Sequence, residues 1–208
     1  LDSLTLETDG VDGKSIYIYG EGWDFGEVEN NARGVNATQL NIGGTGIGVF
    51  NDRLRDGVRG GNPFDDPRLQ GFSTGLAISP KEVEVRSPEV QLEELLDYTN
   101  WIKIGMAGNL SAYTIVKADG EVVDGAHVSY GGKPAGYTLD PQENIIYVSA
   151  HDNETLFDAI QLKAGSETDL QERIRMNNLA LSIPMLSQGI PFFHAGDDIL
   201  RSKSLDKN

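Results

Sequence analysis

The sequence contains no cysteine, which excludes disulfide bonds and thiolate metal ligands. It is also poor in basic residues, with 17 Lys and Arg against 32 Asp and Glu and a formal net charge of −15. Nucleic acids and anionic membranes would repel such a protein, so neither is expected as a partner. A neutral sugar polymer carries no such electrostatic penalty.

Long apolar runs are missing as well. None approaches the roughly 20 residues that a membrane-spanning helix needs, and the amino end shows no basic region followed by an apolar stretch. The chain begins at Leu1–Leu4 without a methionine, in a segment whose pattern predicts an amphipathic helix. We therefore expect the true amino terminus, with any targeting signal, to lie upstream, so a plastid, cytoplasmic or secreted location all stay open.

Three segments share one design, in which an apolar strand leads into a glycine or small residue and then into polar side chains. They are Ile16–Glu21, Ile145–Asp152 and Ile190–Asp198. Continuous apolar strands of this kind are typical of a parallel sheet that is covered on both faces. Barrel enzymes keep their chemistry where such strands end. The polar residues that follow these strands are therefore candidate functional residues.

Helical patterns alternate with the strands and cover Asn51–Val58, Ser87–Leu96 and Glu167–Leu186. Ser87 followed by proline is a plausible helix cap. The alternation of strands and helices predicts an α/β fold. A complete eight-fold β/α barrel usually takes roughly 250 residues, whereas this chain has 208. The sequence therefore predicts one piece of one domain.

Glu21 is the first candidate acid. It lies in Tyr19–Asp24 (Tyr-Gly-Glu-Gly-Trp-Asp) between two glycines, which let the backbone turn tightly and come close to a ligand. Trp23 offers a flat apolar face on which sugar rings stack. A general acid must stay partly protonated, and partial burial against an aromatic ring favours this state. The structural alternative is a glutamate that caps a helix beside a core tryptophan.

His151 and Asp152 form the second candidate group, at the start of His151–Asp158 (His-Asp-Asn-Glu-Thr-Leu-Phe-Asp). Taken alone, a His-Asp pair after a strand is more often a hydrogen-bonded structural pair or an Asx turn. Two other acidic pairs, Asp65-Asp66 and Asp197-Asp198, could bind calcium. Paired acids in loops are more often simply solvated, so we predict no metal. The glycine-rich Gly43–Gly48 lacks the spacing of a dinucleotide-binding motif.

The runs Tyr19–Asp24 and His151–Leu156 together resemble the third and fourth signature regions of type I pullulanases and limit dextrinases, which are debranching members of the α-amylase superfamily of glycoside hydrolases. The resemblance covers nearly the whole chain. It includes Arg33–Ala37, Gly46–Gly48, Phe50–Arg53, Leu186–Gly189 and Phe192–Ser204.

This resemblance implies that Glu21 is the general acid, which protonates the leaving glycosidic oxygen and later activates water. Asp152 would bind sugar hydroxyls and stabilise the oxocarbenium-like transition state, and His151 would donate a hydrogen bond to the same ring. Retaining hydrolysis also needs a carboxylate nucleophile, which the family carries in a Gly-Phe-Arg-Phe-Asp type run after an earlier strand. No such run occurs here, so the nucleophile is expected outside this chain.

Four positions match substrate contacts of the family. Trp23 would wall the cleft, and Asn62 and Phe64 match positions that line its aglycone side in limit dextrinases. Lys207 stands where the family commonly has arginine after a Leu-Asp pair. A donor-side contact by Lys207 would therefore use a point charge in place of a planar guanidinium fork.

The fold that the resemblance implies is a partial (β/α)8 TIM barrel, from the helix after strand 4 to strand 8. Residues 1–208 would be a fragment of one catalytic domain, with the earlier barrel strands and any accessory β-domains outside the chain. If Glu21 and Asp152 share one active site, their carboxyl groups should lie within roughly 5–10 Å of each other.

The implied activity is retaining hydrolysis of α-1,6-glucosidic branch points in pullulan, limit dextrins, amylopectin or glycogen, without a cofactor. The substrate would be the only macromolecular partner apart from the missing amino-terminal part of the same barrel, without which the isolated chain is expected to be inactive. Two alternatives stay open. One is a non-catalytic glucan-binding or regulatory fragment, and the other is a different activity of the superfamily, such as isoamylase-type debranching or α-1,4 hydrolysis.

Overall fold

The computed structural model describes residues 1, 3–82 and 85–207. Its centre is a sheet of four short strands in the order β1-β2-β7-β8, and every neighbouring pair is parallel. The strands are β1 (Tyr19–Gly20), β2 (Gly48–Phe50), β7 (Asn144–Ile146) and β8 (Ile190–Pro191). The predicted α/β class with a parallel sheet is therefore confirmed.

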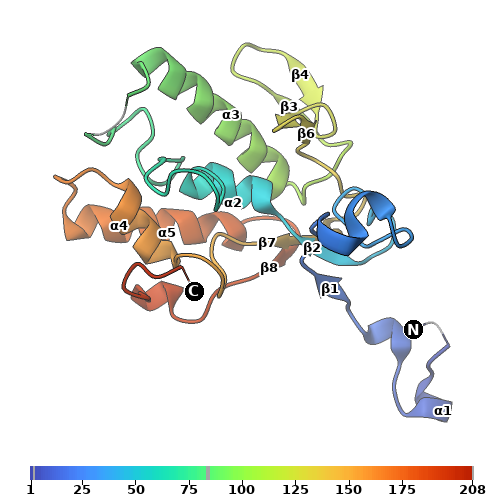
Figure 1. The fold of residues 1–208 in the computed structure, drawn as a ribbon. Helices are drawn as coiled ribbons and strands as arrows, with labels where there is room; N and C mark the ends of the chain where they lie inside the picture. The colour runs from blue at the N-terminus through green and yellow to red at the C-terminus, as the bar shows by residue number, and fades with distance from the viewer. Residues whose placement is uncertain (2, 83–84, 208) are drawn as a thin grey trace.

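Four helices accompany the sheet, and Figure 1 shows them gathered on one side of it. They are α2 (Asp52–Arg59), α3 (Pro88–Met106), α4 (Leu156–Lys163) and α5 (Leu170–Met185). Ser87 caps α3 as predicted, because its hydroxyl accepts a hydrogen bond from the Val90 amide at 3.4 Å. The helix runs ten residues beyond the predicted end at Leu96, since Tyr98, Ile102 and Ile104 are buried. Among the described residues, no helix has the length and apolarity needed to cross a bilayer.

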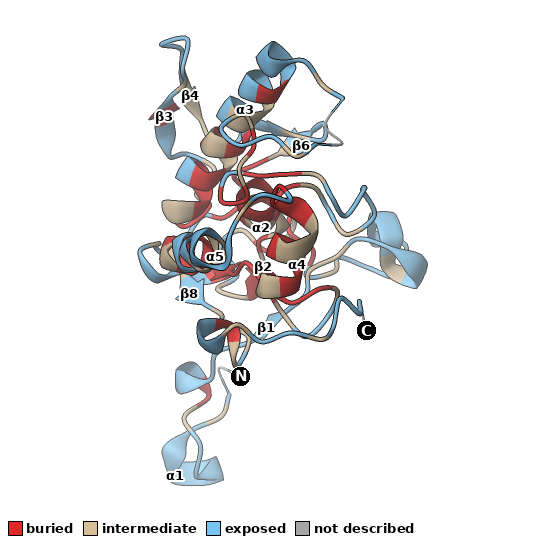
Figure 2. Cartoon of the chain, turned by 90° about the vertical axis from the view of Figure 1, so that its left-hand side faces the viewer, coloured by how far each residue is buried: buried red, intermediate tan, exposed pale blue. Residues whose placement is uncertain are grey.

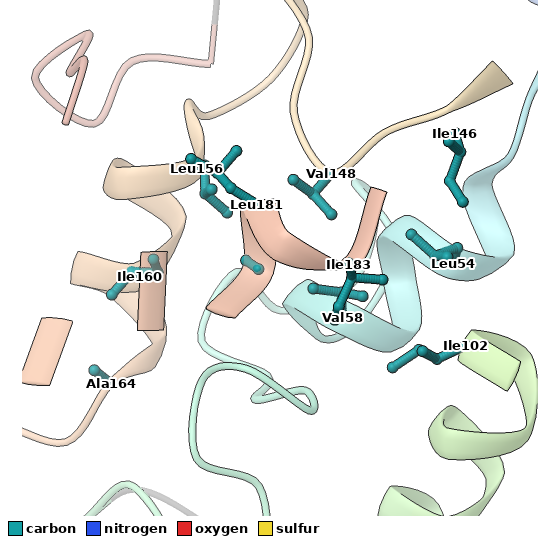
Figure 3. Packing of buried hydrophobic residues seen from close by; sticks show 11 residues of the cluster. Leu54, Val58, Ile102, Ile146, Val148, Leu156, Ile160, Ala164, Leu181 and Ile183 are labelled. Carbon is teal, nitrogen blue, oxygen red and sulfur yellow. The ribbon is translucent and has the colours of Figure 1, made fainter. Parts of the chain in front are cut away.

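The apolar core lies between the sheet and these helices (Figure 3). Ile146 of β7 and Val148, two residues after it, pack with Leu54 and Val58 of α2. Helices α3, α4 and α5 add the remaining members of the cluster, which are Ile102, Leu156, Ile160, Ala164, Ala180, Leu181 and Ile183. Because β7 is an inner strand of the sheet, Ile145 and Ile146 are almost completely buried.

The first predicted strand differs from this pattern. Ile16, Tyr17, Ile18 and Tyr19 are 40%, 39%, 45% and 54% exposed, so the expectation of a buried strand before Glu21 is wrong for the chain as described. The physical reason is the place of β1 at the edge of the sheet, where it pairs with β2 alone.

The amino-terminal segment also differs from its prediction. Helix α1 (Leu6–Asp9) is a single turn without a buried residue, where an amphipathic helix was expected. Figures 1 and 2 show this segment as an arm that extends away from the body of the molecule and is largely exposed. An amphipathic helix needs a surface on which to bury its apolar side, and the described chain offers none at this place.

Shorter elements occupy the connections. Two antiparallel hairpins, β3 (Thr114–Val116) with β4 (Val122–Asp124) and β5 (Ser129–Tyr130) with β6 (Lys133–Pro134), follow α3. Short 3-10 segments are η1 (Gly13–Ser15), η2 (Gly26–Asn31, with a kink at Glu29 and Asn30), η3 (Pro141–Glu143) and η4 (Asp197–Ile199). Both hairpins contribute to a second small core against α3, which contains Ile104, Ile115, Val128 and Ala135.

Candidate active site

The candidate residues follow the carboxyl ends of the parallel strands. Glu21 comes directly after β1, and the His151-Asp152 pair follows β7. Because all four strands run in the same direction, their carboxyl ends meet at one edge of the sheet. Only β2 separates β1 from β7, so the two loops start about 10 Å apart at a strand spacing of about 4.8 Å.

A tight turn positions Glu21. The following residue, Gly22, has a φ of 74°, and a Cβ atom there would lie 2.6 Å from the Cβ of Val49 on β2. Only glycine fits both constraints. The carbonyl of Gly22 also accepts a hydrogen bond from the Gln39 amide at 3.1 Å. Glu21 is therefore held at the sheet edge by its backbone.

The side chain of Glu21 is in a different environment from the one expected. Residue Glu21 is exposed, where the sequence suggested partial burial against an aromatic ring. Its strand β1 lies at an edge of the sheet and pairs with β2, which agrees with the exposure of this carboxyl.

Trp23 is half-buried and lines a cavity of about 410 Å³. The walls come from the loop after β1, the segment 38–41, the start of α2 and the second hairpin. The lining residues include Trp23, Asp24, Phe25, Asn30, Gln39, Asp52, Arg53, Tyr130 and Lys133. An indole face beside amide, carboxylate and basic groups suits a polyhydroxylated ligand, which offers both apolar ring faces and hydroxyl groups.

Sequence analysis missed the polar floor of this cavity. Arg53 is buried, and its guanidinium lies 4.8 Å from the ring centroid of Tyr130 and 4.9 Å from that of Tyr137. Its Nη1 also contacts the side chains of Asp52 and Gln39. The available signal was the position of Asp52 and Arg53 directly after β2, a strand that sequence analysis did not identify because it has only three residues and follows a glycine-rich loop.

His151 and Asp152 are both exposed at the end of β7. The Asp152 Oδ1 accepts a hydrogen bond from the Asn153 amide at 3.0 Å, and Asn153 has a φ of 62°. The carbonyl of His151 accepts a hydrogen bond from the Lys203 Nζ at 2.8 Å. Backbone contacts thus hold the pair, and both residues are exposed.

Buried residues directly after this pair anchor the loop. Thr155 caps α4, because its hydroxyl accepts a hydrogen bond from the Asp158 amide at 3.2 Å. Glu154 is 6% exposed and forms ion pairs with Arg59 and Lys207, each at 3.5 Å. Sequence analysis did not identify α4 as a helix, although a threonine before Leu156-Phe157-Asp158 is a recognisable cap.

The loop with Asn62 and Phe64 lies beside this anchor. Lys207 reaches across to it, with its Nζ 3.5 Å from the carbonyl of Pro63 and 3.5 Å from Glu154. Asn62 accepts a hydrogen bond from the Phe64 amide at 2.8 Å, and the Phe64 ring is almost fully exposed. The structure therefore brings Asn62, Phe64 and Lys207 next to the loop that carries Asp152, whereas Glu21 and Trp23 belong to the neighbouring β1 loop at the same edge.

Asp197 is buried, whereas the sequence predicted a solvated acid in a loop. It is 2% exposed, and burial raises its pKa to about 6. The Nδ1 of His194 lies 4.0 Å from its Oδ1, beyond hydrogen-bond distance. Its neighbour Asp198 is exposed as expected. Within residues 1, 3–82 and 85–207, no group of three acidic or histidine side chains has the arrangement of a metal site.

Comparisons of sequence and fold show which known proteins this chain is similar to. No protein-family model matches the chain. The chain is 54% identical to "Pullulanase 1, chloroplastic" of Arabidopsis thaliana over 209 residues, a stretch that covers 100% of this chain and 22% of the relative. It is 45% identical to the pullulanase of Klebsiella aerogenes over 197 residues, which is 93% of this chain and 17% of that protein.

Solved structures agree with these relatives. The crystal structure of the maltotriose complex of Klebsiella pneumoniae PulA superimposes with a TM-score of 0.87 at 42% identity, over 94% of this chain and 21% of that one. Ligand-free PulA of the same organism gives a TM-score of 0.88. The chain spans about a fifth of the length of the curated relatives it matches. On both sequence and fold, this chain belongs to the pullulanase family.

Proposed function

We propose that this chain is part of a debranching glycoside hydrolase that cleaves α-1,6-glucosidic branch points in pullulan, limit dextrins, amylopectin or glycogen. The observation that carries the proposal is the 54% identity with a plant pullulanase over the whole chain, together with the placement of Glu21 and Asp152 after parallel strands at one sheet edge. The maltotriose in the complex of the similar bacterial protein supports an α-glucan as the ligand.

We further propose that residues 1–208 are a fragment of one catalytic domain, with β1, β2, β7 and β8 as the fifth to eighth strands of a (β/α)8 barrel. Consecutive parallel strands that are neighbours in chain order support this proposal. Both end strands are unpaired on their outer side in the described chain. In a closed barrel each of them would pair with a further strand.

In this proposal Glu21 donates a proton to the glycosidic oxygen as the bond to the branch breaks, and then takes a proton from the attacking water. Asp152 and His151 hold the sugar ring from the end of β7, and Trp23 walls the cleft. Asn62, Phe64 and Lys207 complete the substrate contacts from the neighbouring loops. The attacking carboxylate comes from an earlier strand of the barrel, because retaining hydrolysis needs a second carboxyl group opposite the acid.

The test uses the full-length enzyme that carries this chain and its Glu21→Gln variant. Without the acid, turnover of pullulan should fall by about 10² to 10⁴, while the binding of branched oligosaccharides should change little because glutamine has the same shape. Near-normal turnover by the variant would exclude Glu21 as the acid.

Analysis of the products separates the remaining functions. Maltotriose released from pullulan indicates cleavage at α-1,6 bonds, whereas cleavage of α-1,4 bonds or of amylopectin alone would support another activity of the superfamily. A non-catalytic role is the second candidate function, because the family's nucleophile run is missing from this sequence. Glucan binding by the full-length protein without any release of reducing ends would support that role.

A further inference from the structure

Lys163, the last residue of α4, is a buried lysine outside the candidate site. Its Nζ donates hydrogen bonds to the carbonyls of Gly60 at 2.7 Å and Leu69 at 2.8 Å. These two residues flank the segment 61–68, which carries Asn62 and Phe64. One ammonium group therefore joins both ends of this loop.

The base of the loop is closed by the backbone as well. A Cβ on Gly60 would lie 2.3 Å from the backbone carbon of Gln70, and a Cβ on Gly71 would lie 2.3 Å from the Gly60 nitrogen. The amides of Phe72 and Ser73 donate to the carbonyls of Gly57 and Val58, each at 3.0 Å. The segment is thus a compact surface loop whose two ends lie in contact.

The tip of the loop has only local contacts besides its link to Lys207. The Asn62 amide donates to Asp65 at 2.9 Å, and the Phe64 amide donates to Asn62 at 2.8 Å. Residues 62 and 64–68 are exposed. The orientation of the tip relative to β7 therefore depends on how firmly its base is held.

We propose that Lys163 is a positioning residue, which fixes the loop of Asn62 and Phe64 beside the end of β7 and thereby sets the affinity for branched glucan. This inference rests on the proposed function, in which Asn62 and Phe64 line the substrate cleft. Lys163 is buried and does not touch substrate. It acts through the Gly60 and Leu69 carbonyls, which would be left without this donor if the amine were removed.

The charges around Lys163 fit this role. Glu154, Asp56 and Asp66 attract the ammonium, while Arg59 repels it. Burial, with the repulsion by Arg59, lowers the pKa of Lys163 to about 7. Glu154 also binds Lys207, which contacts Pro63 in the same loop. The base and the tip of the loop are therefore tied to one buried group of charges.

The experiment compares the full-length enzyme with its Lys163→Met and Lys163→Gln variants. Lys103→Met serves as the control, because Lys103 also donates to a backbone carbonyl, that of Val116 at 3.0 Å, but at an exposed position on α3 and not to the loop. Amide hydrogen exchange of segment 61–69 is measured first, since it needs no activity. Exchange should accelerate in Lys163→Met, less in Lys163→Gln, which keeps one donor group, and not in the control.

Steady-state kinetics on branched glucan give the second readout. Lys163→Met should raise KM roughly tenfold, the equivalent of one lost charged hydrogen bond, with kcat changed about twofold or less. If Lys163 had only a structural role, its loss would lower the yield of folded enzyme, but KM would not rise while kcat stayed nearly unchanged. Unchanged exchange in the loop, or a loosened loop with an unchanged KM, overturns the inference.

One more measurement covers the case in which both variants fail to fold. Acylation of the unsubstituted enzyme with an amine reagent, followed by mass spectrometry, should label Lys163 far more slowly than the exposed Lys14 and Lys133. Equally fast labelling would show that the amine is not held and would overturn the inference. If the wild-type enzyme has no activity on branched glucan, the proposed function fails while the loop exchange still decides whether Lys163 holds the loop.

Discussion

Two buried aspartates near the sheet edge show how strongly the pKa of a carboxylate depends on its hydrogen-bond donors. Asp158 is buried, which by itself would raise its pKa, but hydrogen bonds from the Ser202 hydroxyl at 2.6 Å and the Lys203 amide at 2.7 Å outweigh burial and lower it. Asp197 is equally buried, but among the described residues it lacks donors as close as these, and the nearby Ser149 hydroxyl lowers its pKa by less than burial raises it. Burial therefore raises the pKa of Asp197 to about 6.

The first prediction follows from Asp197. Its raised pKa means that Asp197 binds a proton more tightly in the folded state than in the unfolded state. Protonated Asp197 therefore contributes fully to the free energy of unfolding below about pH 4, and this contribution is lost as the pH rises through about 6. Asparagine does not ionise, so Asp197→Asn has no buried charge at high pH. The variant should have a free energy of unfolding about 1 kcal/mol higher than the wild type at pH 7.5.

Denaturant unfolding of the full-length enzyme between pH 4 and pH 8 measures the effect. The wild-type enzyme, measured over the same pH range, provides the reference. An Asp197→Asn protein that is less stable than the wild type at pH 7.5 would contradict the prediction.

A second prediction concerns Trp23, which is half-buried at the wall of the cavity. Trp23→Ala should raise the KM for pullulan by about tenfold or more, because a stacked ring contributes on the order of 1–3 kcal/mol. Trp23→Phe keeps a flat apolar face and should recover most of the affinity. Equal KM values for the wild type and the alanine variant would exclude a stacking role.

At the scale of elements, α2 and α3 cross at two glycines. Gly57 lies where a Cβ would be 3.1 Å from the carbonyl of Tyr98, and Gly105 lies where a Cβ would be 2.7 Å from the Cδ1 of Leu54. Leu54 is completely buried and has no room to move aside. Small residues at the crossing allow the two helix backbones to approach closely, and this contact sets the position of α2 behind the candidate site.

The third prediction is that Gly105→Ala destabilises the protein. Alanine favours a helix interior by about 1 kcal/mol over glycine, but overpacking against Leu54 costs about 1–3 kcal/mol. The net effect should be a lower melting temperature, measured by thermal unfolding. Gly165→Ala is the matched control, because a Cβ at Gly165 meets only ordinary contacts at 3.5 Å and 3.6 Å. A melting temperature that rises in Gly105→Ala would refute the close-packing argument.

At the scale of the whole molecule, the described chain leaves apolar strand residues uncovered. The side chains of segment 16–19 are all at least 39% exposed, and Ile190 on β8 is 39% exposed. These residues lie at the two edge strands of the sheet. Uncovered edges and apolar strand faces favour association with other chains.

The fourth prediction is that the 208-residue chain, when expressed alone, is poorly soluble and inactive on pullulan. Ile18→Lys should increase the soluble fraction, because a charge at an open edge opposes pairing with other chains. Val116→Lys, at an exposed position on the distant hairpin, should help less. The soluble fraction after expression and the release of reducing ends are the measurements, and measurable turnover by the isolated chain would disprove the prediction.

Local signals in the sequence were sufficient for several features. The cap at Ser87 depends only on its own side chain and the next three residues, and the parallel sheet was visible in the apolar run before His151. The two runs around Glu21 and Asp152 identified the family, because a motif of adjacent residues can be recognised without knowledge of the fold. Roles for individual site residues, and the distance between Glu21 and Asp152, stay predictions.

The tertiary structure alone decided features that depend on distant partners. Strand β2 is too short to show a period, and it exists because Val49 and Phe50 pair with β7. The burial of Asp197, the exposure of Glu21 and the contacts of Lys163 were equally invisible in the sequence, since each depends on which residues the fold places around a side chain. By itself the sequence determined the family and the α/β class, through motifs and patterns formed by near neighbours in the chain. Only tertiary packing decided which charges are buried and which loops are held, because those free energies arise between residues far apart in the chain.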